Sequence, residues 1–216
     1  QTGLPQYDKS NHVLGNASWD WTGGLGTTLT YKNLSLSALF DIKVGADLYS
    51  MSARAAYESG KSPETLAGRD AWYRSEEERL AAGIAKGADN WKPTGGFVAP
   101  GVIDNGDGTY RPNDIYINPE DYWMSVCRNA PSMFIYDNSY VKCRELTLSY
   151  NVPKSWLKNV VSGLTVSFVA RNPFIVWKNI PNIDPDSNYN NTTGMGLEYG
   201  SLPSRRSYGF NVNVKF

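Results

Sequence analysis

The residues best suited to bind a ligand are aromatic rings and carboxylates gathered in two long segments, 44–138 and 173–205. Aromatic faces stack on sugar rings, while carboxylates and amides bond hydroxyl groups. The alternative is that these rings pack the segments against each other. We predict substrate contacts from Trp72, Trp91, Trp123, Trp177, Asp184, Asp186, Tyr189 and Tyr199, with Tyr73, Asn188 and Asn190 as further candidates beside them.

Catalytic chemistry has little support in the chain. His12 is the only histidine, so a two-histidine metal site or a serine-histidine pair has no second member. The acidic pairs Asp184/Asp186 and Glu120/Asp121 could imitate the two carboxylates of a glycosidase, but the sequence does not place either pair across a scissile bond. We predict that the chain is not an enzyme and uses no cofactor.

Oxygen-bearing side chains also cluster at Asp104, Asn105, Asp107 and Asp114. A calcium loop would need regularly spaced ligands and a closing glutamate, and the EF-hand pattern is not met. The Asn-Gly-Asp-Gly run between short apolar stretches is instead typical of a hairpin tip. We predict a hairpin and no metal site.

Cys127 and Cys143 are the two cysteines. In an oxidising compartment they could pair and close a loop of about 15 residues, which would stabilise the fold by roughly 3 kcal/mol. The alternative is two unpaired thiols, because Cys127 falls in an expected loop and Cys143 in an expected strand.

Composition narrows the class of protein. The 21 basic and 21 acidic residues cancel, so no field of one sign favours nucleic acid as a partner. Aromatic residues make up 13% of the chain, which suits membrane-interface girdles or sugar-stacking surfaces. No apolar run reaches the roughly 18 residues of a membrane-spanning helix. The chain starts at Gln1 without a signal peptide, so we expect a processed or truncated chain.

Strict alternation of apolar and polar residues is the main structural signal. In the last nine residues, 208–216, every second side chain is apolar or aromatic, as in a strand with one apolar face. An outer-membrane barrel strand has this pattern, with its apolar face toward lipid. Five strands are expected at about 19–31, 34–43, 139–150, 163–172 and 206–216.

The connections between these strands alternate between short and long. The turn at 32–33 and the segment 151–162 are short, whereas 44–138 and 173–205 are long. Membrane barrels have short periplasmic turns and long extracellular loops. Five strands cannot close a barrel, so we predict an all-β fold: the C-terminal antiparallel strands of a large transmembrane barrel, with short helices in its extracellular loops. The alternative is a secreted, soluble β-sandwich that binds carbohydrate, in which the apolar faces would cover each other.

The same alternation assigns charged residues to faces. Glu145 and Arg171 fall on the lumen-facing side and could pair there. Lys142 and Arg144 fall on the lipid-facing side near the outer rim, where lipopolysaccharide phosphates would suit them. The alternative for both cations is ordinary solvation.

Several motifs together resemble the late barrel of SusC/RagA-type TonB-dependent transporters of Bacteroidetes. They are Val13–Asn16, Trp19–Trp21, Gly23–Leu25, Leu29–Leu36, Asp137–Pro153, Arg171–Phe174, Asn182–Asp186, Leu202–Arg206 and the terminal strand that ends in Phe216.

This resemblance implies an outer-membrane barrel of about 22 strands with an N-terminal plug. It implies energy supplied through TonB and a SusD-like surface lipoprotein that helps capture glycans or peptides, with an oligosaccharide as the expected cargo. The expected partners are therefore the remaining barrel and plug, TonB, the lipoprotein, the ligand and the lipid bilayer of a Gram-negative outer membrane. Phe216 resembles the terminal signal for barrel assembly.

Overall fold

The computed structural model describes residues 2–157, 161–187 and 194–216. Its internal contacts divide the chain into two compact units. The first, here called the excursion unit, contains residues 2–13 and 50–134, and the second, the sheet unit, contains residues 14–49 and 135–216. None of the helices in the described part of the chain combines the length and apolarity needed to cross a membrane.

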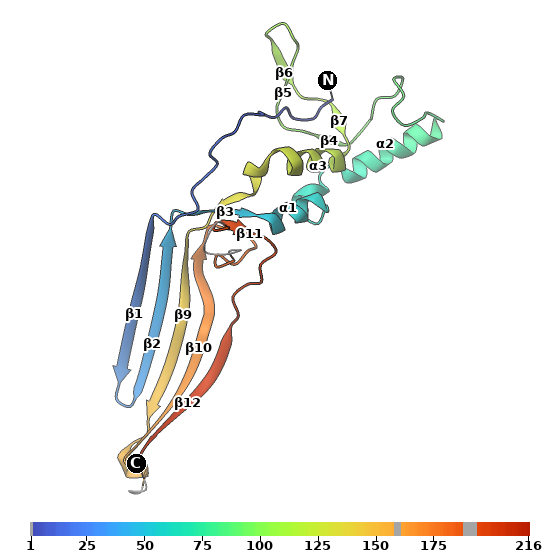
Figure 1. Ribbon diagram of the computed structural model, residues 1–216. Helices are drawn as coiled ribbons and strands as arrows, with labels where there is room; N and C mark the ends of the chain where they lie inside the picture. Colours follow the sequence, from blue (N-terminus) through green and yellow to red (C-terminus); the bar gives the residue numbers. More distant parts are fainter. Residues whose placement is uncertain (1, 158–160, 188–193) are drawn as a thin grey trace. The chain divides into compact units, whose positions relative to one another are not determined.

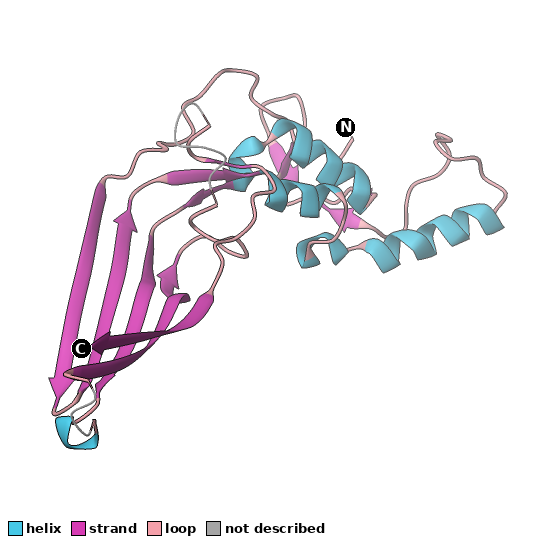
Figure 2. Ribbon diagram, turned by 60° about the horizontal axis from the view of Figure 1, so that its bottom comes forward, coloured by secondary structure: helices cyan, strands magenta, loops and turns pink. Residues whose placement is uncertain are grey.

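The sheet unit is built on five antiparallel strands. They are β1 (Trp21–Tyr31), β2 (Leu34–Val44), β9 (Tyr140–Asn151), β10 (Gly163–Lys178) and β12 (Ser207–Lys215). Their order is β1-β2-β9-β10-β12, so each of the five lies beside the next along the chain (Figures 1 and 2). This up-and-down order places β1 and β12 at the two open edges among the described strands.

Alternation sets the register of these strands. Leu36 lies opposite Leu29 on one side and Leu148 on the other, so apolar side chains share one face across neighbouring strands. The hairpin between β1 and β2 has the predicted two-residue turn. The positive φ of 54° falls on Lys32, however, rather than on Asn33, whose side chain favours that conformation.

The two faces of the sheet differ in chemistry. On the polar face, hydroxyl groups meet across strands: the Oγ atoms of Thr28 and Ser37 are 2.9 Å apart, and those of Ser149 and Ser167 are 2.8 Å apart. On the apolar face, Leu29 is 66% exposed and Phe210 is 80% exposed. In the described part of the chain, no second layer covers this apolar face, as the two faces of a sandwich would cover each other.

A β-bulge at Arg144 interrupts the alternation of β9. Glu145 pairs with Leu39 and Cys143 pairs with Phe40, so Arg144 is the extra residue. Beyond the bulge the faces exchange: Lys142 lies opposite Asp41 on the polar face. The lipid-facing assignment of Lys142 and Arg144 is therefore wrong, because it assumed an unbroken alternation through residue 144.

Shorter elements lie at both ends of the five strands. At the end where β2 stops and β9 starts, strands β11 (Leu197–Glu198), β3 (Asp47–Ser50) and β8 (Ile135–Asp137) form a small sheet in that order. At the opposite end, η3 (Lys154–Trp156) forms one turn between β9 and β10 (Figure 1). Strand β10 continues to Lys178, six residues beyond its predicted end, after register shifts that begin next to Asn172, whose φ is 48°. The second long loop therefore starts later than predicted.

The excursion unit is mainly helical with two small hairpins. Its elements are α1 (Met51–Glu58), η1 (Pro63–Leu66), α2 (Arg69–Ala81), β4 (Phe97–Val98), β5 (Val102–Asp104), β6 (Tyr110–Pro112), β7 (Tyr116–Ile117), α3 (Pro119–Asn129) and η2 (Pro131–Phe134). The β5–β6 pair is the predicted hairpin. A compact apolar core joins Ala99, Ile117, Tyr122, Trp123 and Val126.

Candidate ligand pocket in the excursion unit

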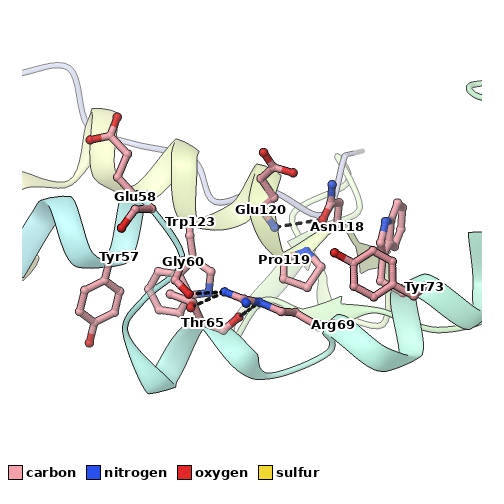
Figure 3. A pocket seen from close by; sticks show the side chains of 12 residues that line it. Tyr57, Glu58, Gly60, Thr65, Arg69, Tyr73, Asn118, Pro119, Glu120 and Trp123 are labelled. Carbon is pink, nitrogen blue, oxygen red and sulfur yellow. Dashed lines mark hydrogen bonds between the residues drawn. The ribbon is translucent and has the colours of Figure 1, made fainter.

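An aromatic pocket in the excursion unit is the most developed candidate site. It encloses about 210 Å³ between α1, η1, α2 and the start of α3 (Figure 3). Its lining includes Tyr57, Arg69, Trp72, Tyr73, Asn118 and Trp123. Two of the predicted ligand-binding rings, Trp72 and Trp123, therefore meet at one site although they are far apart in the sequence.

Helix α3 supplies one wall of this pocket. Asn118 caps the helix by accepting a hydrogen bond from the backbone N–H of Glu120 at 3.0 Å, and Pro119 occupies the first turn. Trp123, one turn further on, is 9% exposed and packs against Tyr57 at 4.9 Å between ring centroids. The sequence analysis missed this helix, although the Asn-Pro-Glu-Asp run is a typical helix start.

The wall of the pocket opposite α3 is held in place where the backbone of the 95–97 segment packs closely against the start of α2. Gly68 precedes α2 with φ 79°, and a Cβ atom built there would lie 2.6 Å from the carbonyl oxygen of Gly96. A Cβ atom at Gly96 would in turn lie 3.0 Å from the ring of Trp72. Glycine at both positions lets the 95–97 segment pack directly on α2, and this packing positions Trp72.

Arg69 is the cation of the pocket, and sequence reasoning did not single it out. Its Nε donates to the carbonyl of Thr65 at 2.9 Å, and its Nη2 donates to the carbonyl of Gly60 and to Oγ1 of Thr65, both at 2.7 Å. Gly60, with φ 67°, makes room for this group, since a Cβ atom there would lie 2.6 Å from Nη2. These neutral partners orient the guanidinium without cancelling its charge.

The other predicted ligand-binding residues lie elsewhere. Trp91 is in the loop after α2, and its buried Nε1 has no hydrogen-bond acceptor among the described residues. Trp177 lies in β10 opposite Val141, on the apolar side, and Tyr199 is 59% exposed just after β11. Tyr189, with Asn188 and Asn190, falls outside the described residues.

Asp184 and Asp186 belong to a separate ionic cluster in the sheet unit. Nζ of Lys142 donates to Asp184 at 3.0 Å and to Asp186 at 2.6 Å, and the Lys142 side chain is only 2% exposed. The hydroxyl of Tyr140 donates to Asp186 at 2.8 Å. Both carboxylates that we predicted as ligand contacts thus bind groups from β9.

Arg144 completes this cluster. Its guanidinium donates to Asp41 of β2 through Nε at 3.1 Å and to Asp186 through Nη2 at 2.8 Å. Burial would raise the pKa of Asp186, but hydrogen bonds from Arg144, Lys142 and Tyr140 outweigh it and hold that pKa well below its usual range. The cluster therefore anchors the loop after β10 to the polar face of the sheet.

Of the two side-chain pairs considered from the sequence, one forms and the other does not. Glu145 and Arg171 lie opposite each other on β9 and β10, with Arg171 Nε 3.5 Å from the Glu145 carboxylate, so the predicted pair forms. Cys127 and Cys143 are both buried free thiols, one in each unit, so the disulfide that we considered is not formed.

The hairpin carboxylates serve as turn caps rather than as a ligand cage. Asp104 accepts from the backbone N–H of Gly106, and Asp107 accepts from that of Thr109. Within the described ranges no group of three or more histidine, cysteine, aspartate or glutamate side chains could hold a metal ion. His12 is exposed and contacts Asp8 at 2.8 Å.

Comparisons with known proteins identify what the chain resembles. No protein-family model matches it. It is 24% identical over 213 residues to TonB-dependent receptor P3 of Formosa agariphila and 26% identical over 211 residues to TonB-dependent receptor P26 of the same bacterium. The chain resembles part of a TonB-dependent receptor. Each match covers 94% of this chain, which spans 17% and 18% of the lengths of the two receptors.

Solved structures show the same fold. The RagAB peptide importer in its closed-closed state matches 98% of this chain and 19% of that chain, with a TM-score of 0.58 and 19% identity. The RagAB peptide transporter matches 93% of this chain and 17% of that chain, with a TM-score of 0.54 and 18% identity. The TonB-dependent receptor resemblance inferred from the motifs is therefore confirmed, and the antiparallel strands have the fold of part of a RagAB chain.

Proposed function

We propose that this chain is the C-terminal part of the barrel of a TonB-dependent importer in a Gram-negative outer membrane. The observation that carries the proposal is the apolar face of the five-stranded sheet, which is exposed in the described chain and runs across every strand from Leu29 to Phe210. A lipid bilayer would cover this face. The polar face, with its rows of hydroxyl groups, would line a wet lumen.

The two open edges support a larger assembly. In hydrocarbon, unpaired backbone groups at a sheet edge cost several kcal/mol each, so β1 and β12 need partner strands. The missing strands and the plug would come from the rest of the importer, whose relatives are several times longer than this chain. TonB would act through that plug, and a SusD-like lipoprotein would cover the extracellular side.

In this arrangement, the excursion unit is an extracellular loop that contributes ligand contacts. Its aromatic pocket and polar rim suit an oligosaccharide as cargo, because rings stack on sugar faces and carboxylates accept from hydroxyls. Trp72 and Trp123 are the predicted ligand-binding residues that line this pocket. Phe216 would act in barrel assembly at the end of β12.

The soluble carbohydrate-binding sandwich is less consistent with the sheet. A sandwich buries its apolar faces against each other, about 10 Å apart. Phe210 and Tyr208 are instead 80% and 62% exposed on that face. No feature of the described residues favours the sandwich.

The decisive experiment is to purify the native polypeptide from outer membranes in detergent, measure its intact mass and map its peptides to this sequence. The proposal expects a polypeptide several times longer than 216 residues whose loss abolishes oligosaccharide uptake. A free polypeptide of this length that stays monomeric and soluble without detergent would overturn it.

A further inference from the structure

We propose that the aromatic pocket of the excursion unit binds the carboxylate of an acidic sugar residue through the guanidinium of Arg69. This inference deepens the proposed function and rests on it for the source of the ligand, an imported oligosaccharide. Nothing in the similarity to TonB-dependent receptors assigns a role to this pocket.

The charge of Arg69 has no acidic partner in the part of the chain that the structure describes. Among the described residues, its three hydrogen bonds go to two carbonyls and one hydroxyl, its Nη1 has no acceptor, and it forms no ion pair. Thr65, which accepts two of these bonds, is 1% exposed, so the guanidinium is held on a rigid support. An oriented arginine with a free donor edge is suited to bind a carboxylate through charge-assisted hydrogen bonds.

Two glutamates also line the pocket but do not neutralise Arg69. In Figure 3 the side chains of Glu58 and Glu120 point to the side opposite Arg69. The Glu58 carboxylate lies 4.0 Å from Nε of Arg54. A bound carboxylate would avoid these two groups, whereas sugar hydroxyls would donate to them, so the pocket distinguishes the acidic edge of a sugar from its hydroxyl edge.

The walls of the pocket favour a ring. Trp72, Tyr73 and Trp123 supply aromatic surface, and Tyr73 is 64% exposed and so accessible to a ligand. Trp123 also carries a buried Nε1 that has no acceptor within the described part of the chain. The protein thus leaves a donor unsatisfied at this wall, which normally costs free energy unless a water or ligand accepts from it.

The size of the pocket limits what enters. Its volume of about 210 Å³ has room for one pyranose ring. An acidic peptide side chain could reach Arg69 as well, but it would leave the ring-stacking wall and the hydroxyl acceptors unused. We therefore assign the site to one uronic acid unit at the end, or at an exposed position, of a longer chain.

The test is calorimetric titration of the full importer in detergent with three probes. They are trigalacturonic acid, the same trisaccharide with its carboxyl groups reduced to alcohols, and an acidic tripeptide. We expect trigalacturonic acid to bind, and the reduced sugar to bind about 10- to 100-fold more weakly, as expected for loss of a charged hydrogen bond. This comparison uses the unaltered protein, so it does not depend on whether a variant folds.

Variants then locate the binding. Arg69→Gln should weaken trigalacturonic acid by a similar factor, while Arg74→Gln, a change at an exposed arginine on the same helix outside the pocket, should have little effect. Equal affinity for the two sugars, or an Arg69→Gln protein that binds normally, would overturn the proposal. So would preference for the tripeptide, even if the mass and uptake measurements uphold the importer function.

Discussion

The two units of this chain differ in where their apolar side chains lie. The excursion unit has a conventional core, in which Val126 is 2% exposed and Phe134 is 1% exposed. The sheet unit has an organised apolar face that its own described residues leave open, with Phe210 80% exposed. One unit therefore buries its apolar side chains within itself, whereas the other leaves an apolar face uncovered by the described residues.

Replacing a phenylalanine by alanine in each unit should give the largest difference in stability between them. Phe134→Ala should destabilise the excursion unit by about 3–5 kcal/mol, because it removes a ring from a closed core. Phe210→Ala should change stability in detergent by less than about 0.5 kcal/mol, because that ring contacts solvent or detergent on one side. Hydrogen exchange of peptides from each unit measures both. Equal costs would mean that the apolar face packs inside a protein core.

Removing one of the two cations of the ionic cluster should destabilise the protein by nearly as much, but only locally. Lys142→Met leaves Asp184 with less compensation in a site where its side chain is 9% exposed, and breaking a buried pair costs about 3–5 kcal/mol. We expect the segment 179–187, which carries Asp184 and Asp186, to become sensitive to protease while the excursion unit is unaffected. Lys154→Met, at an exposed lysine on η3, is the matched control.

A positive charge placed on each face of the sheet tests which face meets lipid. Leu36→Arg should destabilise the barrel in vesicles by about 2–4 kcal/mol if its strand position lies near the bilayer centre. Ser37→Arg, the next residue on the opposite face, should be tolerated. Urea unfolding of the reconstituted importer separates the two outcomes, and a reversed order would exchange the lipid and lumen faces.

Acid should weaken the ionic cluster. Burial raises the pKa of Asp184, but hydrogen bonds from Ser204, Lys142 and backbone N–H groups outweigh it and lower that pKa, as in Asp186. Because the pKa is lower in the folded state, the ionised carboxylates stabilise the fold at pH values above the unfolded pKa of about 4. This stabilisation is lost as the pH falls from that value toward the folded-state pKa. We expect the segment 179–187 to resist protease from pH 5 to 8 and to become sensitive to it below about pH 4. A loop released near pH 6 would contradict this.

The smallest effect should come from the exposed pair across β9 and β10. The Arg171 and Glu145 side chains are 69% and 44% exposed, and such pairs contribute about 0–1 kcal/mol. Arg171→Gln should therefore leave the unfolding midpoint almost unchanged. A large loss would show that this pair lies in a less hydrated lumen than its exposure indicates.

The sequence predicted the strands better than the site. Period-two alternation located β1, β2 and β12 because each has one face of uniform chemistry, and the short turn at 32–33 fixed the pairing of β1 with β2. The pocket depends on contacts between Arg69 and Thr65 and on the approach of Gly68 to Gly96, which have no periodic signal. Only the start of α3 has a recognisable signal in the sequence, the Asn-Pro-Glu-Asp run, and the sequence analysis missed it.

The ionic cluster was mispredicted for a specific reason. Asp184 and Asp186 had the composition of a ligand site, but their partner, Lys142, was assigned to the wrong face because the bulge at Arg144 was not recognised. A bulge adds one residue without changing the residue types around it, so alternation alone does not reveal it.

The bulge also changes which residues of β9 face each side of the sheet. On the C-terminal side of Arg144, the even-numbered residues Leu146 and Leu148 lie on the apolar face. On its N-terminal side, the even-numbered Lys142 lies on the polar face, where it reaches the carboxylates. Deleting Arg144 would remove the bulge and leave Lys142 opposite Asp41, on the polar side. A regular strand that kept Arg144 in the alternation would instead turn Lys142 to the apolar side. The attachment of the loop thus depends on the bulge as much as on the identities of the residues.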